Sequence, residues 1–298
     1  MSRVKLGVLV GIISIGIVSL NLSYGKDNKL ITESLALENE ESTEENIATE
    51  EIKKDDDIVS KGNIIYSAKD YSVKASDVSK ILENPYIGDE KQIFLTFDDG
   101  PSENTDKVVK ILKNEGVYGT FFVLGDSLEA EDSDKRLINT IKSGNALANH
   151  TYSHDYKKLY TNGHVNIDAF IGEILKTNEM MKNILGTDFE CNVIRLPGGY
   201  MTREYYKDKN LKALDDVLRS KGLIQLDWTS ENGDGVTKKE SLEKMLLRVY
   251  EQTEEQKNIV LLMHDSKGKE LTLEALPYII NHFKEKGFIF KVIANDNI

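Results

Sequence analysis

The chain has 298 residues, 40% of them hydrophobic, which is enough to bury the core of one catalytic domain and excludes disorder throughout. Its formal net charge of -12 at pH 7 argues against nucleic-acid binding, because no basic stripe is present to neutralise phosphates. Cys191 is the single cysteine, so the chain cannot form an intrachain disulfide.

The N-terminus has the pattern of an export signal. Two basic residues precede an apolar run from Leu6 to Leu20, and small residues before Lys26 resemble a cleavage site. Because the run is barely long enough to cross a bilayer, an uncleaved anchor is the alternative to a cleaved signal peptide. We expect residues 1–25 to be one or the other. In either case the rest of the chain is extracytoplasmic, secreted or held at the outer face of the membrane, next to the cell wall.

Two further segments precede the catalytic domain. Residues 26–60 hold twelve acidic and four basic residues and few large apolar ones, a composition that cannot compensate the entropy cost of ordering, so we predict a disordered acidic linker. Residues 61–90 are mixed, with Ile64, Ile65 and a helical stretch near 78–82. We expect this segment to be an extension packed on the domain.

Residues 91–298 alternate between short apolar runs and amphipathic stretches. The runs predicted as strands are 93–97, 120–123, 146–148, 193–195, 223–226, 259–263 and 288–292. The stretches predicted as helices are 105–115, 135–143, 167–185, 211–221, 239–253 and 273–286. This alternation indicates a parallel α/β sheet, either doubly wound or closed into a barrel, with ligands at the carboxyl ends of the strands.

The first polar cluster is a pair of carboxylates. Asp98 and Asp99 follow strand 93–97 and precede a Gly-Pro-Ser turn. Two like charges this close need a cation. The alternative is an Asx-turn or helix N-cap, for which Asp-Gly-Pro-Ser is well suited.

The second cluster is a pair of histidines. His150 and His154 follow strand 146–148, and their spacing places both imidazoles on one face of a helical turn, which is typical of metal ligands. Surface histidines at this spacing by chance are the alternative.

Two more strand ends carry polar groups. Arg195 is followed by a Pro-Gly-Gly turn and could hold a carboxylate, although a surface ion pair beside a tight turn fits equally. His264 ends strand 259–263 and suits general acid or base catalysis, with a buried core histidine as the alternative. Asp234 also follows a strand. Taken together, the four strand ends indicate a mononuclear metal hydrolase.

These motifs, in this order, resemble those of the polysaccharide deacetylases of carbohydrate esterase family 4, the NodB-homology domain. Thr96-Phe97-Asp98-Asp99-Gly100 resembles the first motif, which implies Asp98 as the catalytic base and Asp99 as a metal ligand. The stretch from His150 to His154 resembles the second, which implies that both histidines are metal ligands.

The later motifs imply further roles. Arg195 begins the third motif and would orient the base, while the backbone N–H of Gly198 would bind the oxyanion. His264 ends the fifth motif and would be the general acid. The fourth motif departs from the family pattern: Glu231 and Asp234 stand for its two acids, and Gly235 replaces the usual tryptophan. Asp234 could still pair with His264, but the aromatic wall of the acetyl pocket must come from elsewhere.

The resemblance also implies an architecture and an activity. The architecture is the family's distorted (β/α)7 barrel, spanning residues 91–298. The activity is N-deacetylation of a cell-wall polysaccharide with release of acetate. Peptidoglycan is the first expected partner of an exported enzyme, and its N-acetylglucosamine is the expected target. N-acetylmuramic acid, chitin oligomers and acetylxylan remain alternatives. So does a catalytically silent glycan-binding module, because of Gly235.

The ligand set indicates which cofactor to expect. Two imidazoles and one carboxylate suit one divalent zinc ion, while cobalt and nickel accept the same set. We expect a monomer. A phosphoryl-transfer enzyme would need a phosphate cradle or a lysine clamp, and the sequence contains neither.

Overall fold

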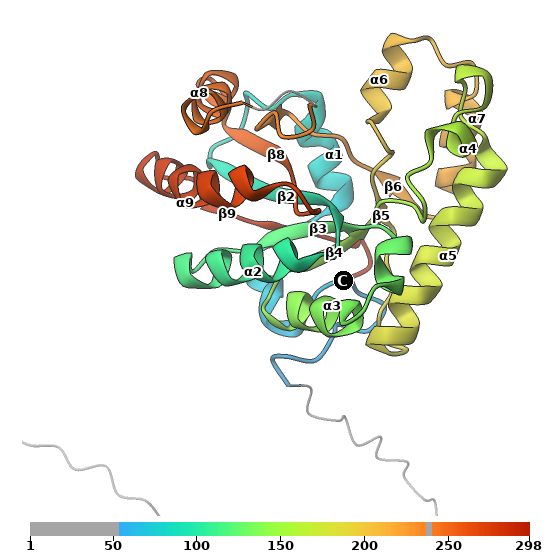
Figure 1. Ribbon diagram of the computed structural model, residues 1–298, viewed down its shortest axis with the longest axis horizontal. Helices are drawn as coiled ribbons and strands as arrows, with labels where there is room; N and C mark the ends of the chain where they lie inside the picture. Colours follow the sequence, from blue (N-terminus) through green and yellow to red (C-terminus); the bar gives the residue numbers. More distant parts are fainter. Residues whose placement is uncertain (1–53, 237–239) are drawn as a thin grey trace, which may run out of the picture. The chain divides into compact units, whose positions relative to one another are not determined.

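A curled parallel sheet forms the centre of the computed structural model, which describes residues 54–236 and 240–298 (Figure 1). Its strand order is β6-β5-β4-β3-β2-β8-β7. The bounds are β2 Gln92–Gly100, β3 Gly119–Val123, β4 Ala146–Asn149, β5 Val193–Ile194, β6 Ile224–Gln225, β7 Ser230–Glu231 and β8 Asn258–His264. Strands β2 to β6 lie side by side in chain order, and β8 and then β7 lie on the other side of β2. This circular order, interrupted between β6 and β7, confirms the predicted distorted (β/α)7 barrel rather than a doubly wound sheet.

Helices line the outside of the sheet. The long ones are α2 Glu103–Glu115, α3 Ser133–Lys142, α5 Ile167–Leu185, α7 Leu211–Ser220, α8 Leu242–Thr253 and α9 Glu270–Glu285. Neighbouring helices follow one another in the order α8, α9, α2, α3 and α5 (Figure 1). Local signals fix their ends: Ser102 caps α2 through a capping box, and Gly116 ends it at φ 63°. Helix α8 begins three residues after its predicted start because Ser241 is its N-cap.

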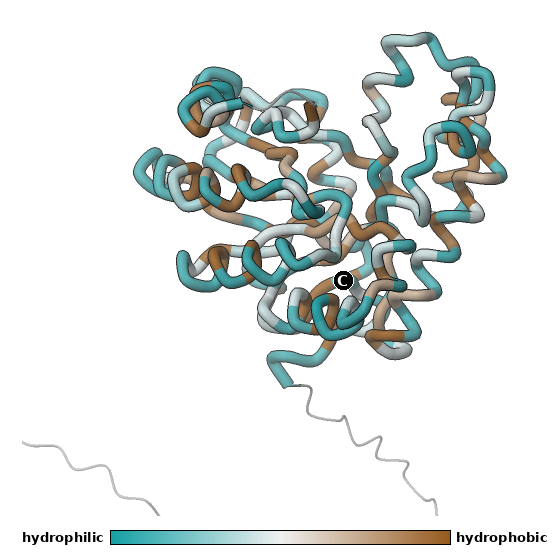
Figure 2. The backbone as a smooth tube through the Cα atoms, viewed as in Figure 1, coloured by the Kyte–Doolittle hydropathy of each residue, from teal (hydrophilic) through white to brown (hydrophobic). Residues whose placement is uncertain are grey.

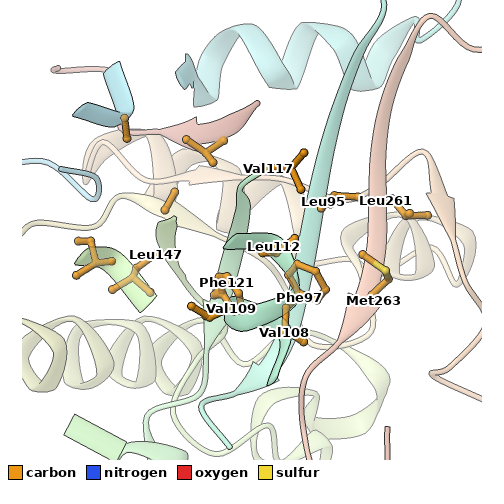
Figure 3. Close-up of a cluster of buried hydrophobic side chains, with 14 of the residues drawn as sticks. Leu95, Phe97, Val108, Val109, Leu112, Val117, Phe121, Leu147, Leu261 and Met263 are labelled. Carbon is orange, nitrogen blue, oxygen red and sulfur yellow. The ribbon is translucent and has the colours of Figure 1, made fainter. Parts of the chain in front are cut away.

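Side-chain alternation along β2 divides the core into two layers. Leu95 and Phe97 face the helices and pack with Leu112 of α2 and Leu261 of β8 (Figure 3). Phe94 faces the barrel interior, in a cluster that also holds residues of β3, β4, β5, β6 and β8. Hydrophobic residues accordingly concentrate in the strands and on the helix sides that face them (Figure 2). Side chains along a strand alternate between its two faces, so Thr96 and Asp98 face the barrel interior as Phe94 does. Asp98 therefore lies at the end of the barrel interior.

One strand prediction is confirmed only in part. The run 288–292 divides into β9 Ile289–Phe290, which pairs in parallel with β2 in the main sheet, and β10 Val292–Ala294, which pairs with β1 Ser72–Lys74 in a separate two-stranded sheet. Strand β7 takes the seventh place in the barrel. Two residues are too few to show an alternating pattern, so the sequence carries no signal for β7.

Segments before β2 contribute to the same core. Val59, Ile64, Ile65 and Ala68 belong to the main hydrophobic cluster, and Ile58 bridges to Ile65. Helix α1 Ala75–Glu83 adds Ala75 and Val78 to the interior cluster. The packed region therefore includes residues of the predicted extension 61–90 and the last residues of the predicted linker.

The described residues all belong to one compact unit. The predicted signal or anchor at residues 1–25, and the predicted linker up to residue 53, lie outside them. Among residues 54–236 and 240–298, no helix is both long enough and apolar enough to cross a membrane.

Candidate active site

A bulge at the end of β2 places two adjacent carboxylates in one site. In a regular strand Asp98 and Asp99 would point to opposite faces of the sheet. The pairing of β2 with β3 shifts register between Asp98 and Gly100, and Asp99 has φ 74°. Bulges of this kind re-aim a side chain. As a result, the carboxylates of Asp98 and Asp99 lie 3.6 Å and 3.5 Å from Nε2 of His150.

A buried arginine holds the Asp98 carboxylate. Arg195 is fully buried, Asp98 is 2% exposed, and Nη1 of Arg195 donates to Oδ1 of Asp98 at 2.8 Å. The guanidinium also donates to Thr96 Oγ1 and to the carbonyls of Leu226 and Asp227, so β2 and the end of β6 fix it. Burial raises the pKa of Asp98, although Arg195 opposes this shift.

Asp99, His150 and His154 form a cluster suited to a metal ion. One ligand atom from each lies within 4.8 Å of the others. Within the described residues, Oδ1 of Asp99 is buried without a hydrogen-bond partner, and Nε2 of His150 and of His154 lie 3.5 Å and 3.7 Å from it. An acceptor left unpaired between two imidazole nitrogens is what a cation would satisfy. The residues present therefore fit a divalent metal.

The tautomer of His150 suits ligation. Its Nδ1 lies 2.9 Å from the carbonyl oxygen of Arg195, an acceptor, so Nδ1 carries the proton and Nε2 presents its lone pair to Asp99. Burial lowers the pKa of His150 to about 3, against the opposing charge of Asp99. The imidazole is therefore neutral at physiological pH, as a metal ligand must be.

The expectation that the two histidines share a helical turn is wrong. Residues 150–154 form an irregular loop in which Thr151 and His154 have φ 72° and 51°. Oδ1 of Asn149 accepts from Thr151 N, and the carboxylate of Glu173, on α5, accepts from the amides of Tyr152 and Ser153. These acceptors replace the i to i−4 bonds of a helix. The loop still brings the imidazole centroids of the two histidines within 5.1 Å.

On the other side of β2, His264 pairs with Asp234. Nδ1 of His264 lies 2.6 Å from Oδ1 of Asp234, and Oδ2 of Asp234 accepts from the His264 amide at 2.9 Å. Burial alone would lower the pKa of His264, but the hydrogen bond and charge of Asp234 outweigh it and raise this pKa to about 9. Nε2 of His264 lies 3.9 Å from Oδ2 of Asp99. A protonated imidazole therefore stands beside the ligand cluster.

The two acids of the fourth motif, Glu231 and Asp234, lie in different parts of the structure. Asp234 reaches the site, whereas Glu231 lies in β7 and its carboxylate makes no hydrogen bond or ion pair in the part of the chain that the structure describes. A Cβ on Gly235 would lie 3.3 Å from Cε1 of His264, so this position borders the imidazole. Among residues 54–236 and 240–298, no Phe, Tyr or Trp side chain comes within 4 Å of that Cβ position.

Trp228 supplies an aromatic group that the sequence analysis did not assign. Its ring reaches the Pro-Gly-Gly turn, since a Cβ on Gly199 would lie 2.8 Å from its Cη2. The preceding residue, Asp227, was also missed. Its carboxylate accepts from the amides of Tyr200 and Met201, the first residues of α6 Tyr200–Tyr205, and thereby holds the turn that carries Gly198. An Asp-Trp pair directly after strand 223–226 was the available signal.

A further acid joins the ends of β2 and β8. Asp265 donates its amide to the carbonyl of Asp98, and its carboxylate accepts from Thr105 Oγ1. Its own carbonyl accepts from Ser102 Oγ at 2.6 Å. Burial raises the pKa of Asp265 to about 7. These bonds fix the end of β2 relative to His264.

The structure thus brings together Asp98, Asp99, His150, His154, Arg195, Asp234 and His264. All come from strand ends or the loops that follow them, as parallel α/β folds require. The Gly198 turn lies next to this set, because it directly follows Arg195 in the chain and because Asp227 holds it through the amides of Tyr200 and Met201.

Comparisons with known proteins identify the family of the chain. The family model for polysaccharide deacetylase matches residues 86–215. Over 218 residues the chain is 30% identical to a peptidoglycan-N-acetylglucosamine deacetylase of Bacillus cereus, which covers 72% of this chain and 70% of that protein. Over 211 residues it is 28% identical to the peptidoglycan-N-acetylmuramic acid deacetylase PdaA of Bacillus subtilis, covering 70% and 73%.

A solved structure gives the same result. A CE4 esterase from Streptococcus mutans has a TM-score of 0.72 and 31% sequence identity, covering 80% of this chain and 99% of that one. The chain therefore belongs to the polysaccharide deacetylases of carbohydrate esterase family 4.

Proposed function

We propose that the chain is a metal-dependent N-deacetylase of peptidoglycan that releases acetate from N-acetylglucosamine. One observation carries the proposal. A carboxylate and an imidazole outside the ligand set, Asp98 and His264, each lie within 4 Å of it, at 3.6 Å from His150 and 3.9 Å from Asp99. Each has its own buried partner. Such a pair supplies a base and an acid to one reacting centre.

Asp99, His150 and His154 would hold the metal. A divalent ion bound there would lower the pKa of a water molecule and polarise the acetyl carbonyl. Zinc is the first expectation for two imidazoles and one carboxylate, with cobalt and nickel as alternatives.

Asp98 is the proposed general base. Its Oδ1 is occupied by Arg195, so Oδ2, on the His150 side, is the oxygen free to accept a proton from the attacking water. Because three further hydrogen bonds fix the Arg195 guanidinium, it orients this carboxylate without reorganisation during the reaction.

His264 is the proposed general acid. Since Asp234 holds Nδ1, the proton available for transfer is on Nε2. When the C–N bond breaks, that proton goes to the departing nitrogen, which would otherwise leave as an amide anion. Products are acetate and the free amine of the sugar.

The backbone N–H of Gly198 is the proposed donor to the oxyanion. Asp227 fixes the turn through the amides of Tyr200 and Met201, and Tyr160 Oη donates to the Pro197 carbonyl at 2.7 Å. A donor held in this way stabilises developing charge without reorganising. Trp228, beside Gly199, takes the place of the aromatic wall that the fourth motif lacks.

The substrate and location follow from the relatives and the N-terminus. The Bacillus cereus relative is named for N-acetylglucosamine of peptidoglycan, which supports this sugar, and PdaA makes N-acetylmuramic acid the alternative. The export signal predicted at residues 1–25 would bring the enzyme to the wall as a secreted or anchored monomer.

Product analysis tests the proposal. The zinc-loaded chain without residues 1–25 is incubated with purified peptidoglycan, and acetate and the masses of digested muropeptides are measured. We expect acetate release that a chelator abolishes, with the mass loss on glucosamine. Asp98→Asn and His264→Ala should abolish turnover and keep the metal, whereas Asp216→Asn, an exposed carboxylate, should be neutral.

Other outcomes are decisive too. Mass loss on muramic acid would replace the sugar in the proposal. Glycan binding without acetate release would instead favour the silent binding module, and near-normal rates in Asp98→Asn or His264→Ala would reject the assigned roles.

A further inference from the structure

Tyr156 lies beside the ligand cluster and has no role in the reaction described above. It begins the short helix α4 Tyr156–Leu159, which Asp155 caps. Its ring meets the imidazole of His154 edge-on, with centroids 5.4 Å apart, and 45% of the residue is exposed. Tyr156 is therefore accessible to a molecule that reaches the cluster.

The hydroxyl of Tyr156 points to the Gly198 turn. Gly198 has φ 75°, and a Cβ built on it would collide with Oη of Tyr156 and lie 3.1 Å from its Cζ. A Cβ position is two bonds from the backbone nitrogen of the same residue. The phenol oxygen thus lies on the side-chain face of Gly198, the residue whose N–H is proposed to bind the oxyanion, and only glycine leaves room for it there.

This hydroxyl has an unused donor. Among the hydrogen bonds of the described residues, none involves Oη of Tyr156. The neighbouring Tyr160 differs, because its Oη donates to the Pro197 carbonyl at 2.7 Å. The Tyr160 ring packs against that of Tyr156 at 5.4 Å, and the Arg203 guanidinium lies 4.4 Å over Tyr160. One tyrosine therefore fixes the turn, while the other presents an O–H beside it.

We propose that Tyr156 is a further catalytic residue, whose hydroxyl donates a hydrogen bond to the acetyl oxygen of the substrate together with the Gly198 N–H. The proton stays on Tyr156 throughout, and no bond to it forms or breaks. This inference rests on the proposed function, since the reacting group is an acetyl amide. A second donor beside the first would strengthen as charge develops on that oxygen.

The alternative role for Tyr156 is that of an apolar platform for the sugar ring. The two roles depend on different atoms. Tyr156→Phe removes only the hydroxyl, whereas Tyr156→Ala also removes the ring. Tyr205→Phe is the matched control, because Tyr205 is 80% exposed and contacts Tyr206 rather than the turn.

Steady-state kinetics on a soluble N-acetylglucosamine oligomer give the first readout. In Tyr156→Phe we expect kcat to fall about 10- to 100-fold while KM changes less than about threefold, the pattern of a contact made mainly in the transition state. Bound zinc, measured after dialysis, should equal that of the wild type. Tyr205→Phe should keep the wild-type kcat.

Acetate binding gives a second readout that needs no turnover. Trp228 is the single tryptophan of the chain and adjoins Gly199, so its fluorescence can follow acetate titrated into the zinc-loaded protein. Loss of one hydrogen bond to a carboxylate should weaken the acetate Kd about 5- to 20-fold in Tyr156→Phe.

The outcomes separate this inference from the proposed function. Unchanged kcat and acetate Kd in Tyr156→Phe, or a raised KM in Tyr156→Ala alone, overturn the hydroxyl role. Loss of zinc in Tyr156→Phe overturns it too, because Tyr156 would then act through His154. If the wild type releases no acetate, the proposed function fails, but the acetate Kd of the wild type and of Tyr156→Phe still decides the role of Tyr156. If the zinc-loaded wild type binds no acetate, the proposed role of Tyr156 is overturned.

Discussion

Replacing Asp234 with asparagine should remove the charge that keeps His264 protonated. Oδ1 of Asp234 lies 2.6 Å from Nδ1 of His264, and its Oδ2 accepts from the His264 amide and from Thr272 Oγ1. An asparagine can keep the contact to Nδ1 through its amide oxygen. Its NH2 group would then face the His264 amide and Thr272 Oγ1, the two donors that now donate to Oδ2. The variant should lose about 1–3 kcal/mol of stability from this mismatch.

The larger effect is on the pKa of His264. In the folded protein this pKa is raised to about 9, and burial opposes the shift. An unperturbed histidine has a pKa of about 6.5, so the interactions of the charged form amount to at least about 3 kcal/mol. Without the Asp234 charge, burial should bring the pKa of His264 back to about 6.5, against the weaker opposing charges of Asp98 and Asp99. At pH 7.5 less than about a tenth of the acid would then be protonated, so the rate should fall about tenfold or more.

The pH profile of kcat/KM tests this directly. His264 acts as an acid, so activity is present below its pKa and is lost as pH rises through about 9 in the wild type. The alkaline limb should move down by about 2.5 pH units in Asp234→Asn. The acid limb, set by Asp98, should stay. Thr272→Val removes one hydrogen bond to the Asp234 carboxylate but leaves the charge of that carboxylate in place. The alkaline limb of this variant should therefore move much less. An alkaline limb that stays near pH 9 in Asp234→Asn would show that another group is the acid.

Three other substitutions test the supports of the site. Arg195→Lys keeps a buried charge but cannot reproduce the planar fork that binds Asp98 and three other oxygens, so denaturant unfolding should show a loss of about 2–4 kcal/mol and kcat should fall. Asp227→Ala frees two amides at the Gly198 turn; kcat should fall about tenfold while bound zinc stays constant in metal analysis. Gly100→Ala would place a Cβ against the Asp265 carboxylate, and a melting temperature several degrees lower is expected, whereas an unchanged one would contradict the close packing of β2 on β8.

Residues at the ends of strands could be identified from the sequence because two regular patterns locate them. Apolar runs mark the strands, and parallel strands place their carboxyl ends at one edge of the sheet. Asp98, His150, Arg195 and His264 were selected on that basis, and the structure gathers all four. The long helices were also predictable, since their amphipathic faces repeat over ten or more residues and caps such as Ser102 mark their ends.

The tertiary structure decided what no local pattern encodes. Strand β7 exists only because β8 pairs with it, and β10 leaves the barrel because β1, over 200 residues earlier, is its partner. The His150–His154 loop takes its shape from Glu173 on α5 rather than from helical spacing.

The same holds for the groups that complete the site. By itself the sequence determined a parallel α/β sheet and the identity of the groups at its strand ends, through periodicity and spacing along the chain, while the barrel followed from the resemblance of its motifs to a family. It did not determine that Asp227 and Tyr156 converge on Gly198, or that Arg195 reaches across to Asp98, 97 positions away. Such contacts depend on distances in space between segments far apart in the chain, and one side chain touching another leaves no repeat that a sequence can display.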